Sequence, residues 1–173
     1  MHYVLLSCRF LIALTFAASV LGKIRGKVAY RGFVAATQRL APTLPTRVTA
    51  LAVIAAEILI IFLLVAQVTL SYGFIAAALL FVTFTFSLVK ARLRGDEESC
   101  HCFGKSTEPI GVAHIARNII LIVVSCCGAV LSLLSQTSSI SYEAGGVGAA
   151  FIAAFIGATV IVLSDDISFL LKN

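Results

Sequence analysis

The sequence predicts an all-α integral membrane protein, a helical bundle of four or five transmembrane helices. Hydrophobic residues make up 60% of the 173 residues and charged residues only 12%, whereas soluble domains carry about 25% charged residues. The mean hydropathy is +1.06. The apolar residues also form long runs, and about 20 such residues in a helix span the hydrocarbon core of a membrane. These observations exclude an ordinary soluble domain.

The basic residues are placed as membrane anchors. The net charge of +5 would suggest nucleic acid binding in a soluble protein, but here the Lys and Arg residues stand in short connections beside apolar runs. We therefore expect membrane lipid, and no nucleic acid, as a partner. Five cysteines are an odd number, and Cys8, Cys126 and Cys127 lie inside apolar runs, which excludes a secreted disulfide scaffold.

The first span is predicted at residues 4–22. Arg9 interrupts this run and no small-x-small cleavage site precedes its end, so a span is favoured over a signal peptide. Residues 23–47 are predicted to form a basic, partly amphipathic surface segment. This segment has no acidic residue and six basic ones, Lys23, Arg25, Lys27, Arg31, Arg39 and Arg47.

Two further spans are predicted at residues 48–68 and 70–89. Two prolines precede the first of them and end any earlier helix, and Thr46 is placed to cap the helix that follows. The connection between the two apolar runs is very short. We therefore expect a tight hairpin with its turn around residues 71–73.

A charged connection, residues 90–111, leads to a fourth span at 112–134. A Ser/Thr-rich loop then leads to a fifth span at 144–163. Small residues recur at every fourth position of that last run, at Gly146, Ala150, Ala154 and Ala158. Such a stripe lets helices approach closely, although an Ala-rich helix would show the same pattern without close packing.

The orientation follows from the basic residues. With five spans, the 23–47 segment, the 90–111 connection and the C-terminus share one face, and the two opposite connections carry no Lys or Arg. The positive-inside rule puts the shared face in the cytoplasm and the N-terminus outside. A cysteine pair on that face would then meet a reducing thiol pool.

The string C-H-C-F-G at residues 100–104 carries the chemistry of the charged connection. Cys100 and Cys102 could exchange disulfides, because nearby cations stabilise a thiolate. The cations Lys90, Arg92, Arg94 and Lys105 are partly offset by Asp96, Glu97, Glu98 and Glu108. Alternatively, Cys100, His101 and Cys102 could bind Cu(I) or Zn, one ligand short of a closed site. Incidental cysteines are the third option, but a polar loop gains little from packing them.

Ionisable residues inside the spans are further candidates. Glu57 lies about ten residues beyond Arg47, hence roughly 15 Å into the bilayer, and a charge at that depth suggests function. By the same residue counting, Arg9 on the first span is its expected partner. The pair could fix helix register or take part in proton or quinone chemistry.

The fourth span adds polar groups and thiols. Arg117, beside Asn118, could reach the charged connection and stabilise a thiolate, or anchor the helix at the interface. His114 is expected to be an ordinary interfacial residue. Cys8 falls at a similar depth to Cys126 or Cys127, so a second thiol pair would form if the first and fourth spans touch. Cysteines are also common in apolar helices without any such role.

The C-H-C-F-G string, followed by Arg117-Asn118 in the next span, resembles the methylamine-utilisation MauE family, DoxX-like multi-span proteins of the bacterial inner membrane. Lys23 at the end of the first span and Glu57 in the second match as well. The resemblance covers about residues 6–134 and implies one membrane domain for the chain, residues 1–173.

The resemblance implies maturation of the methylamine dehydrogenase light subunit, a periplasmic protein with many disulfides, beside a thioredoxin-like partner. Cys100 and Cys102 would be the exchanging pair, and Glu57 and Arg117 supporting groups. The family has Gly between the cysteines, so His101 is a departure that keeps metal binding open. The cofactor stays open, with a quinone compatible and a metal less favoured. The alternative is a non-enzymatic assembly or transport factor whose loop binds a metal or docks a partner.

Overall fold

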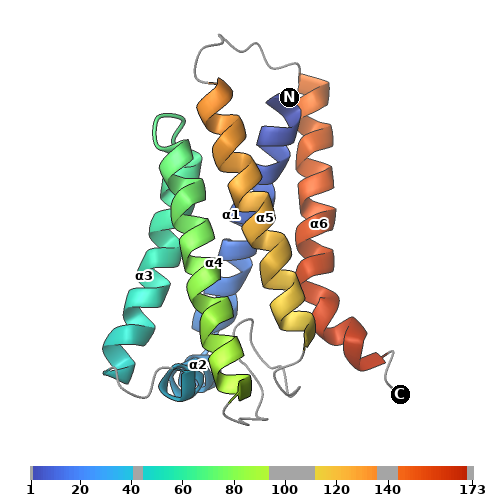
Figure 1. Ribbon diagram of the computed structural model, residues 1–173. Helices are drawn as coiled ribbons and strands as arrows, with labels where there is room; N and C mark the ends of the chain where they lie inside the picture. Colours follow the sequence, from blue (N-terminus) through green and yellow to red (C-terminus); the bar gives the residue numbers. More distant parts are fainter. Residues whose placement is uncertain (1, 41–44, 94–111, 136–143, 171–173) are drawn as a thin grey trace.

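The computed structural model describes residues 2–40, 45–93, 112–135 and 144–170, and within these ranges it is helical with no strand. The all-α prediction is confirmed. The helices are α1 (His2–Ile24), α2 (Lys27–Leu40), α3 (Thr46–Val65), α4 (Leu70–Leu93), α5 (Val112–Ser135) and α6 (Ala144–Leu170) (Figure 1).

The long helices α1, α3, α4, α5 and α6 run along the bundle with alternating direction, and α2 lies across one end of it (Figure 1). This end, called the α2 end, holds the last residues of α1 and α4 and the first residues of α3 and α5. The helices that flank the 90–111 connection thus meet the bundle at the same end as the basic 23–47 segment, as expected. The side of the membrane that this end faces stays a prediction.

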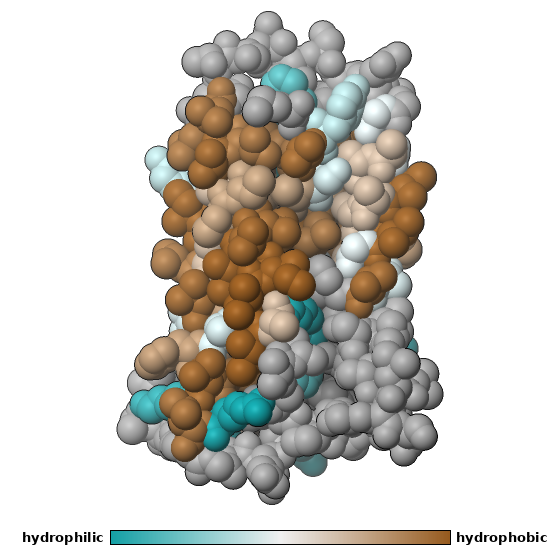
Figure 2. Space-filling model, turned by 45° about the vertical axis from the view of Figure 1, so that its right-hand side comes forward, coloured by the Kyte–Doolittle hydropathy of each residue, from teal (hydrophilic) through white to brown (hydrophobic). Residues whose placement is uncertain are grey.

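The lateral surface is that of a membrane protein. Helices α1, α3, α4 and α5 are long and apolar enough to cross a membrane, and α6 contributes a shorter apolar stretch, Gly146–Val160, within the described residues. Large apolar side chains point outward, with Phe62 69% and Phe86 67% exposed. Figure 2 shows hydrophobic side chains over much of the described lateral surface on one face. An apolar surface of this extent marks contact with lipid.

The main core lies where α1, α3, α4 and α5 meet. Phe16 of α1 stacks on Phe81 of α4 with 4.9 Å between ring centroids, an arrangement that adds to the gain from burial. The buried residues of this cluster are Leu5, Ile12, Phe16, Ile60, Leu64, Leu70, Phe74, Ala77, Phe81 and Leu121.

The basic segment forms the amphipathic helix that the sequence predicted. Phe33 of α2 is buried with Val20, Ala50 and Ile54 in a second apolar cluster, while basic side chains of α2 such as Arg31 are exposed. The helix therefore covers the α2 end of α1 and α3 with its apolar face and leaves its charges outside.

The small-residue stripe of α6 packs against α1. Ala150, Ala154 and Ala158 are buried, and α6 makes its most extensive contact with α1. Phe10 of α1 meets Phe151 of α6 edge to face at 5.3 Å between ring centroids. The close-approach interpretation of the stripe is therefore confirmed.

Two local predictions around α3 were wrong. Pro45, not Thr46, occupies the position before α3, and it makes no side-chain cap hydrogen bond. The turn after α3 also comes earlier than residues 71–73: the Thr69 hydroxyl donates to the Leu63 carbonyl at 2.9 Å, and Gly73 N–H donates to the Thr69 carbonyl at 2.9 Å. Because α4 begins at Leu70, residues 71–73 already belong to its first turn.

A hydroxyl pair links α4 to α5 inside the bundle. Ser132 Oγ donates to Ser71 Oγ at 2.9 Å, and both side chains are buried. We expect a double-mutant cycle with Ser71→Ala and Ser132→Ala to give a coupling of about 0.6 kcal/mol, the average for polar pairs between membrane helices. Reversible unfolding in detergent measures it, and fully additive effects would contradict the contact.

Candidate functional site

A buried ion pair joins the last turn of α1, at the α2 end, to the middle of α3. Lys23 Nζ donates to Glu57 Oε1, and the two residues are only 2% and 0% exposed. Lys23 Nζ also donates to Ser19 Oγ at 2.9 Å, and Ser19 Oγ donates to the same Glu57 oxygen at 3.0 Å. Ser19 and Lys23 are one helical turn apart, so both point from one face of α1. These three residues are called the polar cluster below.

Two aromatic rings enclose the ammonium group. The ring centroid of Phe33 on α2 lies 4.8 Å from Lys23 Nζ, and that of Phe84 on α4 lies 5.7 Å from it. Both distances are in the range of cation–π attraction, which strengthens when the cation is removed from water. Helices α1, α2, α3 and α4 therefore all contribute to the surroundings of Lys23.

The second carboxylate oxygen of Glu57 can still accept a hydrogen bond or a proton. Glu57 Oε2 is buried and has no hydrogen-bond partner in the part of the chain that the structure describes. Buried polar atoms are normally satisfied, and an unsatisfied one calls for a reason. An acceptor with an open position is suited to take a proton or a hydrogen bond from a group that arrives during function.

The start of α5 buries further polar residues. His114, Arg117 and Asn118 are 6%, 6% and 5% exposed, and their spacing puts them on one face of the helix. His114 is therefore buried against protein, and its depth relative to the membrane interface stays a prediction. Arg117 likewise sits inside the bundle rather than on its lipid surface. Both lie near the α2 end, in the first turns of α5.

The predicted redox pair lies outside the described residues. Cys100, His101 and Cys102 fall between Leu93, the last residue of α4, and Val112, the first of α5. Their contacts, including the alternative metal site, therefore stay predictions. Within the described ranges no group of three or more His, Cys, Asp or Glu side chains could hold a metal ion.

The expected pairing of Glu57 with Arg9 is wrong. Arg9 Nη1 donates to Gln67 Oε1 at 3.0 Å, and Nη2 donates to the Val65 carbonyl, so Arg9 binds the far end of α3. Fourteen residues separate Arg9 from Lys23, about 21 Å along α1. Since Glu57 is bonded to Lys23, Arg9 is out of its reach.

The role of Lys23 and Ser19 was not predicted from the sequence. Lys23 was interpreted as a loop anchor because it is the first basic residue after an apolar run. The signal that could have indicated the cluster is the spacing of Ser19 and Lys23, one turn apart on an otherwise apolar helix. Together they present a hydroxyl and an ammonium group to a neighbouring carboxylate.

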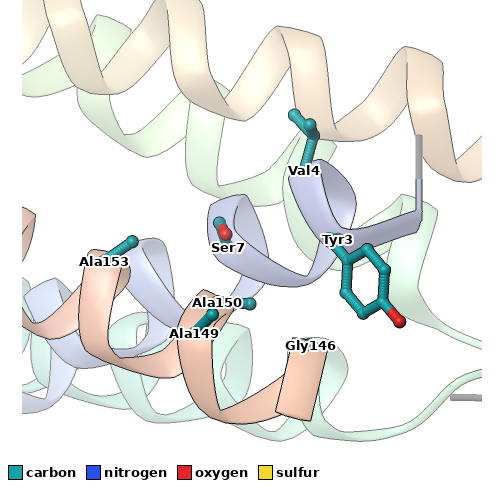
Figure 3. Close-up of a pocket in the computed structure, with 7 residues that line it drawn as sticks. All are labelled: Tyr3, Val4, Ser7, Gly146, Ala149, Ala150 and Ala153. Carbon is teal, nitrogen blue, oxygen red and sulfur yellow. The ribbon is translucent and has the colours of Figure 1, made fainter. Parts of the chain in front are cut away.

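A shallow groove lies at the opposite end of the bundle, between α1 and α6 (Figure 3). Its volume is about 360 Å³. Because Tyr3 is 20 residues from Lys23, the groove lies about 30 Å from the polar cluster along α1. The lining residues are Tyr3, Val4, Ser7, Gly146, Ala149, Ala150 and Ala153.

Fold and site together define a multi-pass α-helical membrane protein with a buried ion pair at the end where a charged, cysteine-bearing connection departs. The chain belongs to the MauE family, since the model of methylamine utilisation protein MauE matches residues 1–135. No curated protein and no solved structure matches the chain. Family membership implies a role in methylamine utilisation as a membrane protein.

Proposed function

We propose that this protein supports thiol–disulfide exchange in the maturation of an exported protein, with Cys100 and Cys102 as the redox pair. The exported protein in this proposal is the methylamine dehydrogenase light subunit, and the working partner is a thioredoxin-like protein; membership of a methylamine-utilisation family supports this choice. The protein acts in the bacterial inner membrane. A disulfide between Cys100 and Cys102 takes two electrons and two protons from a partner dithiol, which becomes a disulfide.

The polar cluster is the observation that carries this proposal. Its Lys23 stands in the last turn of α1, at the end of the bundle where the cysteine-bearing connection leaves α4 and enters α5, and Glu57 lies deeper, in the middle of α3. Exchange needs a thiolate, which a nearby cation stabilises, and it moves protons, which a carboxylate with an open oxygen can accept. Arg117, buried near the start of α5, offers a second cation on the same side.

Single serine substitutions test the redox pair. We expect the purified full-length protein, oxidised with diamide, to convert a reduced two-cysteine peptide to its disulfide. The variants Cys100→Ser and Cys102→Ser should lose this reaction completely, because an intramolecular disulfide needs both sulfurs. Cys126→Ser, a matched change outside the connection, should retain it. Full peptide oxidation by both loop variants would overturn the proposal.

His101 separates exchange from metal binding. Under the proposal, His101→Ala still oxidises the peptide, with a changed reduction potential. A metal-binding loop instead predicts that the wild-type protein binds Zn²⁺ tightly and that His101→Ala loses this binding. If both are observed, and if peptide oxidation is unchanged in His101→Ala, Cys100→Ser and Cys102→Ser, the loop is a metal site and the exchange proposal fails.

The proposal also requires that Cys100 and Cys102 can be reached from outside the cytoplasm. Exchange with an exported partner needs Cys100 and Cys102 on the oxidising side of the membrane, against the expectation from the positive-inside rule. We expect a membrane-impermeant maleimide to label the pair in intact cells only after reduction. Labelling only after lysis would place the pair in the cytoplasm and contradict direct exchange with an exported protein.

A further inference from the structure

The amphipathic helix α2 carries basic residues on the face turned away from the bundle. Phe33 and Thr37 of α2 are buried, and they lie one turn apart on its inner face. Lys27, Arg31 and Arg39 are exposed, and their spacings of four and eight residues put them together on the opposite, outer face. The outer face of α2 is therefore a row of cations.

Two of these cations repel each other along the helix. Lys27 and Arg31 are one turn apart, and like charges at this spacing destabilise a helix. Within the described residues neither side chain takes part in an ion pair, and residues 23–47 contain no acidic residue. An anion that both side chains contact would remove the repulsion and stabilise α2.

The position of α2 and the apolar side chains beside its cations favour lipid as the source of that anion. Helix α2 lies across the end of the bundle where α1 ends and α3 begins (Figure 1), which is the level of the lipid headgroups for helices that cross the membrane. Val28, beside Lys27, is 77% exposed, and Ile24, beside Arg25, is 54% exposed. Apolar side chains next to cations fit the boundary between acyl chains and lipid phosphates, whereas a soluble anion would leave the apolar side chains in water.

We propose that the outer face of α2 binds the phosphate headgroups of anionic lipids, and that these lipids hold α2 over the polar cluster. The ring centroid of Phe33 lies 4.8 Å from Lys23 Nζ, so the ammonium group stays enclosed only while α2 keeps its position. Of the 14 residues of α2, two are buried, so its contact with the bundle is small and the lipid contacts on the outer face add to it. The inference is independent of the proposed function, because it involves none of the cysteines.

The test uses an introduced Trp, because the chain contains none. Full-length protein is reconstituted in liposomes of equal amounts of phosphatidylcholine and phosphatidylglycerol, with bromine atoms, which quench Trp fluorescence, on the acyl chains of one lipid or of the other. Val28→Trp reports on the outer face of α2, and we expect brominated phosphatidylglycerol to quench it severalfold more than brominated phosphatidylcholine. Leu134→Trp is the matched control, since it is an exposed apolar position at the opposite end of the bundle, and both lipids should quench it equally.

Charge variants and hydrogen exchange identify the binding face. Added to Val28→Trp, the change Lys27→Gln/Arg31→Gln should abolish the preference for phosphatidylglycerol. Lys90→Gln/Arg92→Gln removes the same charge from exposed residues of α4 at the α2 end, and it should leave most of the preference. In the unlabelled protein, the backbone amides of α2 should exchange severalfold more slowly in the mixed liposomes than in phosphatidylcholine alone, and Lys27→Gln/Arg31→Gln should remove this difference.

Three outcomes would overturn the inference. Equal quenching of Val28→Trp by the two brominated lipids would mean that the outer face of α2 does not select anionic lipid. An equal loss of preference in the α2 and α4 charge variants would mean that the lipids follow the total charge of the α2 end and no site on α2 exists. If the α2 amides exchange at the same rate in both kinds of liposome, anionic lipid does not hold the helix over the polar cluster.

Discussion

Lys23→Met is expected to lower the free energy of unfolding by about 3–5 kcal/mol, the usual result of removing one partner of a buried ion pair. The loss leaves the Glu57 carboxylate inside the bundle, where the polar cluster is fully enclosed. Ser19 alone then faces the charge, and one neutral hydroxyl does not replace the ammonium group. Glu57→Leu should be similarly damaging, because it leaves the Lys23 ammonium group buried beside two aromatic rings.

The double variant Lys23→Met/Glu57→Leu should recover most of this loss. It removes both charges together, and an apolar pair of similar volume is often as stable as a buried ion pair. Reversible unfolding in detergent measures all three proteins. Arg9→Met is a control on the same helix, and it should cost at most about 1 kcal/mol because exposed polar contacts contribute little. Single variants as stable as the wild type would contradict a buried pair.

The double variant also separates the two roles that a buried pair can have. If the polar cluster moves protons during exchange, the folded double variant should oxidise the two-cysteine peptide more slowly than the wild type. If Lys23 and Glu57 serve only to fix helix register, the peptide should be oxidised at the wild-type rate. The unfolding measurement shows that any loss of rate is not a loss of folded protein.

The fold class and the helices could be predicted because hydropathy and helix length are local properties of the chain. Runs of about 20 apolar residues must become helices in lipid, since every backbone polar group needs a partner within the segment. The partly amphipathic character of α2 could also be predicted, because basic residues recur along this segment with no acidic residue among them. Glu57 stood out as a lone carboxylate in an apolar run.

The partner of Glu57 could not be predicted by counting residues. Counting gives a position along the membrane normal, but it does not give the rotation of a helix, its tilt or the reach of a side chain. Lys23 lies at the end of α1, yet its side chain turns into the bundle and meets Glu57. Arg9 was counted as near Glu57 and instead binds the far end of α3.

Gly128→Ala is expected to lower the free energy of unfolding by about 1–3 kcal/mol, the cost of overpacking a well-packed core. A Cβ atom at Gly128 would lie 2.4 Å from Cε1 of Phe74, far inside van der Waals contact. Phe74 is 0% exposed and belongs to the main core cluster, so its ring has little room to move. Either that ring leaves its position or α5 separates from α4, and both outcomes disturb the contact that small residues make possible.

Gly148→Ala is the matched control for this prediction. Nothing lies within 4 Å of a Cβ atom at Gly148, and alanine favours the helix by about 1 kcal/mol over glycine. This variant should therefore unfold at or above the wild-type midpoint in detergent. Adding Phe74→Leu to Gly128→Ala should restore part of the lost stability, because the smaller side chain makes room for the methyl group. If Gly128→Ala were as stable as Gly148→Ala, α4 and α5 would not approach each other as closely as the structure places them.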